Sequence, residues 1–147
     1  MGVKRKRRCW PSRRAIARAA TLISGPPAHG RAFAARFRAR DDMEAVSREE
    51  LLDRLRCGAV TLIDVRPEDE FAHGHLPGAL NIPLGRLELR LAELPPDREV
   101  VAYCRGPWCV LSFEAVALLR RRGHLARRLE DGFPEWKVAG LPVESAQ

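Results

Sequence analysis

The segment 100–112, VVAYCRGPWCVLS, carries two cysteines five positions apart, Cys104 and Cys109. Cys104 directly follows the segment 99–103, EVVAY, whose apolar residues predict a buried strand. An amphipathic helix is predicted to follow over residues 113–122. Cys104 is therefore expected in a tight loop between the end of a strand and the start of a helix.

This loop favours a reactive thiol at Cys104. Gly106 and Pro107 are turn residues, and a loop of this kind points backbone N–H groups inward beside the positive end of the helix dipole. Arg105 adds a nearby positive charge. A cysteine in these surroundings ionises easily, and the thiolate is the nucleophilic form. The sequence predicts Cys104 as a nucleophile, with a small apolar residue closing the strand as the alternative.

The positive charge of the chain is concentrated in residues 1–40. They hold 12 of the 26 Lys and Arg residues and none of the 19 Asp and Glu, so they carry +12 and the remainder carries −5. This composition is typical of a disordered basic extension, with nucleic-acid or membrane attraction as the alternative.

No apolar run approaches the roughly 20 residues that a membrane-spanning helix needs. Four cysteines in a chain with an adequate core favour a cytoplasmic location.

From Ser47 onward, predicted helices and strands alternate. A capping box at Ser47 begins the first helix, and the expected strands are 59–65, 79–82, 99–103 and 126–129. This alternation predicts an α/β fold with a central, mostly parallel sheet and helices on both faces. The working site of such folds lies at the carboxyl ends of the strands. Asp64 and Arg66 end one strand there, and Cys104 ends another.

Three segments resemble the signatures of rhodanese domains. Residues 62–83, LIDVRPEDEFAHGHLPGALNIP, resemble the amino-terminal signature of that family, and residues 101–106, VAYCRG, resemble its active-site loop. Residues 130–136, EDGFPEW, followed by GLPV at 140–143, resemble its closing segment. The resemblance implies a single rhodanese-like α/β domain over residues 47–145.

The resemblance also implies a sulfurtransferase activity. The Cys104 thiolate would attack a small sulfur donor such as thiosulfate or a persulfide, carry the sulfur as a persulfide, and pass it to a thiol or cyanide. No cofactor and no metal are expected. Asp64 and Arg66 are expected to support the rim of the site, with Arg66 in a buried ion pair near its acidic neighbours 68–70. The substrate-binding loop is expected to consist of Arg105, Gly106, Pro107, Trp108 and Cys109.

The sequence departs from the family pattern at two positions of this loop. Many rhodanese loops keep a glycine three positions after the cysteine, where this chain has Pro107. The second cysteine, Cys109, resembles a subgroup of rhodanese domains fused behind arsenic-repressor-type winged-helix regulators. A winged helix needs roughly 70 residues, more than precede the domain here, so we expect no DNA binding.

Three alternatives follow from the same loop. Phosphatase or arsenate-reductase chemistry needs an arginine six positions after the cysteine, and Val110 occupies that position. A structural zinc site needs four ligands, and the two cysteines of this loop do not provide them. A redox or metalloid-sensing module remains open: Cys109 would attack a Cys104 persulfide or sulfenate to form a disulfide, or both thiolates would bind arsenite. Cys109 as a packing residue beneath the loop is the competing interpretation.

Overall fold

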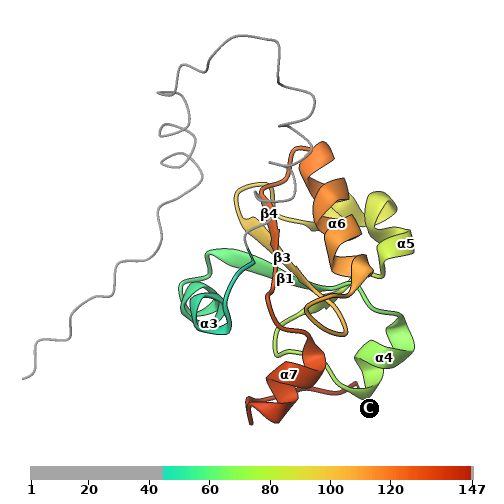
Figure 1. Ribbon diagram of the computed structural model, residues 1–147. Helices are drawn as coiled ribbons and strands as arrows, with labels where there is room; N and C mark the ends of the chain where they lie inside the picture. The colour runs from blue at the N-terminus through green and yellow to red at the C-terminus, as the bar shows by residue number, and fades with distance from the viewer. Residues whose placement is uncertain (1–44, 147) are drawn as a thin grey trace, which may run out of the picture.

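Four parallel strands form the centre of the fold, in the order β2-β1-β3-β4 (Figure 1). The computed structural model describes residues 45–146. The strands are β1 (Val60–Asp64), β2 (Leu80–Asn81), β3 (Glu99–Tyr103) and β4 (Ala126–Arg128). Every strand pairing is parallel, which confirms the predicted sheet.

Helices precede, connect and follow these strands. They are α3 (Arg48–Arg56), α4 (Glu68–His73), α5 (Leu84–Leu87), the 3-10 helix η1 (Glu88–Glu93), α6 (Val110–Arg121) and α7 (Phe133–Val138). The predicted start of α6 at Phe113 is wrong by three residues. The helix begins at Val110 because Cys109 is the last residue with an extended backbone, and Leu111 already packs against the core.

The side chains of β3 alternate between two hydrophobic cores. Val100 and Ala102 belong to a core that α5, η1 and α6 cover, whereas Val101 and Tyr103 belong to a core that α3 and α7 cover. Helices therefore lie on both faces of the sheet, as the alternation of elements predicted (Figure 1). Cys104 continues the first core, on the side of α6.

The predicted cap of the first helix is confirmed, because the Ser47 hydroxyl accepts a hydrogen bond from the Glu50 N–H at 3.2 Å. His75 makes a local contact, with its Nδ1 2.9 Å from the Phe71 carbonyl oxygen. None of the helices between residues 45 and 146 is long and apolar enough to cross a bilayer. The basic segment 1–40 lies outside the described residues.

Candidate active site

The two strand ends that the sequence singled out lie side by side. β1 and β3 are paired in parallel, and Asp64 is in register with Tyr103. The Val65 N–H donates a hydrogen bond to the Tyr103 carbonyl oxygen at 3.2 Å, which extends the pairing beyond the strands. The Asp64 and Arg66 turn and the cysteine loop therefore meet at the carboxyl edge of the sheet, as predicted.

The cysteine loop, residues 105–109, connects β3 directly to the N-terminus of α6. Cys104 is only 1% exposed, and Cys109 is partly buried against the same core. Their sulfur atoms are bonded to each other, with the two Cα atoms 6.2 Å apart. Cys109 thus packs against the core and also turns its sulfur toward Cys104.

Backbone contacts hold this loop on both sides. The Cys109 N–H donates to the Gly106 carbonyl oxygen at 3.2 Å, and the Phe133 N–H donates to the Cys104 carbonyl oxygen at 3.0 Å. A Cβ added to Gly132 would lie 2.2 Å from the Gly106 nitrogen. Since real Cβ atoms do not approach backbone so closely, only glycine allows the segment before α7 to lie against the loop.

Arg128 of β4 is a loop contact that the sequence reasoning missed. Its Nη1 donates to the Pro107 carbonyl oxygen at 3.2 Å, and its guanidinium lies 4.4 Å from the centre of the Phe113 ring. Burial lowers the pKa of Arg128 from its usual value. A local sequence pattern could not have predicted this contact, because it joins residues that are 21 positions apart in the chain.

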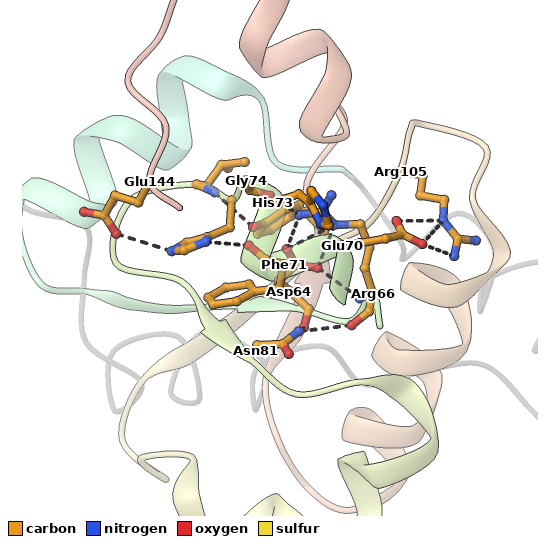
Figure 2. Close-up of polar contacts among 12 residues, drawn as sticks. Asp64, Arg66, Glu70, Phe71, His73, Gly74, Asn81, Arg105 and Glu144 are labelled. Carbon is orange, nitrogen blue, oxygen red and sulfur yellow. Dashed lines mark hydrogen bonds and ion pairs between the residues drawn. The ribbon is translucent and has the colours of Figure 1, made fainter. Parts of the chain in front are cut away.

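The guanidinium of Arg105 is paired with the carboxylate of Glu70 in α4 (Figure 2). The Arg105 Nε lies 2.9 Å from Glu70 Oε1, and both side chains are partly exposed. Hydrogen bonding and charge from Glu70 raise the pKa of Arg105, and the Arg105 hydrogen bond lowers the pKa of Glu70. The prediction that Arg105 adds positive charge to the thiol therefore needs correction, because Glu70 neutralises much of it.

A buried ion pair joins Arg66 to Asp64, also drawn in Figure 2. The Arg66 Nη2 lies 2.6 Å from Asp64 Oδ2 and donates to the Gly74 carbonyl oxygen at 2.7 Å. Burial disfavours the charged guanidinium, but hydrogen bonds and charge from Asp64 outweigh it, so the pKa of Arg66 is raised. The predicted buried pair is confirmed, whereas the expected partners at 68–70 were wrong. Arg66 pairs with Asp64 instead, because the turn after β1 folds the Arg66 side chain back over the end of the strand.

This ion pair is fixed from two sides. The amide of Asn81 donates to the carbonyl oxygens of Asp64 and Arg66, at 3.2 and 3.0 Å. The Arg66 guanidinium lies 4.6 Å from the centre of the Phe133 ring, next to the segment that contacts the cysteine loop. Asp64 and Arg66 thus contact each other and Gly74, Asn81 and Phe133. Their role in supporting the rim of the site stays a prediction.

A surface cavity of about 560 Å³ adjoins the Arg66 and Glu70 side chains. Its walls also include Asp69, His73 and Lys137, so it presents charges of both signs. Neither Cys104 nor Cys109 is among the residues that line it. The cavity lies next to the candidate active site without containing its cysteines.

Residues 47–139 match the rhodanese-like domain family, and the chain belongs to this family. The match confirms the family that the three sequence segments indicated. It also covers every expected site residue, from Asp64 to Cys109.

The relatives of this chain include both sulfurtransferases and a regulator. A sulfurtransferase of Allochromatium vinosum is 38% identical over 85 residues, which cover 57% of this chain and 78% of that protein. A human single-domain sulfurtransferase superposes with a TM-score of 0.57 at 32% identity, covering 64% of this chain and 95% of the other. An HTH-type transcriptional regulator of Mycobacterium tuberculosis is 54% identical over 101 residues, which cover 69% of this chain. The match spans only 45% of that regulator's length.

Removing the charge of Asp64 should destabilise the domain strongly. Asp64→Asn leaves the buried guanidinium of Arg66 without its counter-ion, so we expect the free energy of unfolding to fall by about 3–5 kcal/mol. Asp53→Asn is the matched control, because the pair of Asp53 with Arg56 is exposed and contributes about 0–1 kcal/mol. Urea denaturation of both variants measures the difference, and equal effects would contradict a structural role for the buried pair.

Adding a methyl group at Gly132 should displace the cysteine loop. Gly132→Ala places a Cβ 2.2 Å from backbone, so we expect a loss of stability of about 1–3 kcal/mol. Gly85→Ala is the control, because Gly85 has open space around it and lies in α5. Thermal unfolding of both variants checks this, and an unchanged melting temperature for Gly132→Ala would show that the close approach is not required.

Proposed function

We propose that this domain is a sulfurtransferase that carries sulfane sulfur on Cys104. In its reduced form, the Cys104 thiolate attacks the outer sulfur of thiosulfate or of a low-molecular-weight persulfide. A persulfide forms on Cys104, and sulfite or a thiol leaves. A second displacement passes the outer sulfur to a thiol or to cyanide, so the enzyme alternates between two covalent states.

One observation carries this proposal: Cys104 is the first residue after β3, an internal strand of a rhodanese-family sheet, and a five-residue loop leads from it to α6. The N-terminus of this 12-residue helix favours negative charge in the loop. The loop residues Arg105 to Cys109 surround the sulfur and form its binding surface. Neutralisation of Arg105 by Glu70 leaves the helix terminus as the main source of stabilisation for the thiolate and the persulfide.

The sulfurtransferases among the relatives support this reaction class. We assign the activity to residues 47–145 and treat residues 1–40 as a basic extension. Because the chain matches less than half of the regulator's length, we carry no DNA binding over from it. We place the reaction in the cytoplasm, where reducing conditions keep thiols available.

A redox or metalloid-sensing module is the second candidate function. The bond between Cys104 and Cys109 favours it, and so does the similarity to a transcriptional regulator. In this case the pair would respond to an oxidant or bind a thiophilic metalloid, and turnover of sulfur donors would be absent. Steady-state sulfur transfer therefore separates the two candidates.

Replacing Cys104 should abolish sulfur transfer. After reduction with dithiothreitol and removal of the reductant, Cys104→Ser should lose thiosulfate:cyanide activity by about 10³-fold or more, since the covalent carrier is gone. Cys57→Ser is the control, because Cys57 is the C-cap residue of α3 and lies before the amino end of β1, whereas Cys104 follows the carboxyl end of β3. The initial rate of thiocyanate formation measures the activity, and parallel double-reciprocal plots are expected for Cys109→Ser, in which Cys104 cannot be lost to the disulfide. Full activity in Cys104→Ser would rule out this assignment.

The oxidised protein should be inactive until it is reduced. In the bonded form neither sulfur is a thiolate, so a sample oxidised with diamide should release no sulfite from thiosulfate. Dithiothreitol should restore the activity of the same sample. Equal rates before and after reduction would show that the bond between the cysteines does not block the carrier.

A further inference from the structure

The pairing of the two cysteines carries an inference that rests on the proposed persulfide chemistry. The Cα atoms of Cys104 and Cys109 lie 6.2 Å apart. This separation is within the range of about 4.4–6.8 Å that disulfides occupy. The folded loop therefore brings the Cys109 sulfur to the Cys104 sulfur without rearrangement of the backbone.

The loop also holds Cys109 in this position. Its N–H donates to the Gly106 carbonyl oxygen at 3.2 Å, and its carbonyl oxygen accepts a hydrogen bond from the Ser112 hydroxyl at 3.0 Å. Cys109 is the N-cap residue of α6, yet its side chain makes no capping hydrogen bond. Its sulfur is bonded to Cys104 in this structure, and after reduction it lies at a helix end that favours the thiolate.

We infer that Cys109 is an internal acceptor that reduces the Cys104 persulfide and releases hydrosulfide. The Cys109 thiolate attacks the inner sulfur of the persulfide, Cys104 Sγ. The bond between the two Sγ atoms forms, and the bond from Cys104 Sγ to the outer sulfur breaks. The outer sulfur leaves with the electron pair of the broken bond, and it leaves as HS⁻ because it keeps the persulfide proton or takes up the proton that Cys109 released when it ionised. The sulfane sulfur is reduced, and the two cysteines are oxidised to the disulfide.

The tether makes this step competitive with external acceptors. A partner joined by a short flexible segment has an effective concentration on the order of millimolar or more. The loop is more restricted than a flexible tether, since Arg128 holds the Pro107 carbonyl and Gly106 accepts from Cys109. The sulfur of Cys109 is thus kept near its target before any donor arrives.

The two cysteines differ in their access to a reductant. Cys104 is 1% exposed in the bonded form, whereas Cys109 is partly exposed between Trp108 and Val110, which are 86% and 61% exposed. A dithiol reductant attacks Cys109 Sγ, and Cys104 leaves as the thiolate. The second thiol of the reductant then releases Cys109. The full cycle converts sulfane sulfur and a dithiol into sulfide and a disulfide.

A single-turnover experiment tests this step. The full-length chain is prepared with Cys9→Ser and Cys57→Ser, so that Cys104 and Cys109 are its only thiols. It is reduced, desalted without oxygen and mixed with one equivalent of thiosulfate, and, in a parallel sample, with one equivalent of glutathione persulfide. Sulfite or glutathione reports loading of Cys104, sulfide reports the second step, and intact mass reports the state of the cysteines. The same background with Cys109→Ser, Cys109→Ala or Cys104→Ser completes the set.

With both cysteines present, we expect about one equivalent of sulfide for each sulfite or glutathione released, and a protein that has lost two hydrogen atoms. Cys109→Ser and Cys109→Ala should instead gain one sulfur atom and release no sulfide. Cys104→Ser should do neither. If the two-cysteine protein also keeps the added sulfur and releases no sulfide, the internal acceptor is refuted while the carrier role of Cys104 stands. If no protein loads sulfur from either donor, the proposed function itself fails, and this inference fails with it.

Discussion

The position of strand β3 determines the geometry of the candidate site. This strand lies between β1 and β4 and is hydrogen bonded to both, and all five of its side chains are buried. Cys104 follows it directly, and its carbonyl oxygen accepts a hydrogen bond from the Phe133 N–H. The sulfur of Cys104 is thus placed by the sheet, because a rigid element holds a reactive group more accurately than a mobile loop does.

The charged side chains near the loop form ion pairs with one another. Arg66 is committed to Asp64, and Arg105 is paired with Glu70. In the proposed chemistry, negative charge on sulfur is therefore stabilised mainly by the N-terminus of α6. The same backbone holds both covalent states of the pair, since Cys109 is the N-cap residue of that helix and its N–H is hydrogen bonded to the Gly106 carbonyl oxygen.

Most of the fold could be predicted from the sequence, because its elements follow local rules. The Ser47 cap, the β-branched run of β1 and the apolar run before Cys104 each depend on neighbouring residues. The contacts that hold the loop could not be predicted in this way. Arg128 reaches the Pro107 carbonyl from another strand, and Gly132 matters only because distant backbone lies against it. The sequence predicted the start of α6 three residues too late, because the loop is shorter than its turn residues indicated.

The central claim is that Cys104 carries the sulfur while the loop keeps its folded shape. A crystal structure of the reduced Cys109→Ser variant soaked in thiosulfate tests this claim most directly. We predict one additional sulfur atom about 2.05 Å beyond Cys104 Sγ, with the loop backbone unchanged. An unmodified Cys104 in crystals that were soaked with donor, or a sulfur atom attached to a different cysteine, would contradict the account.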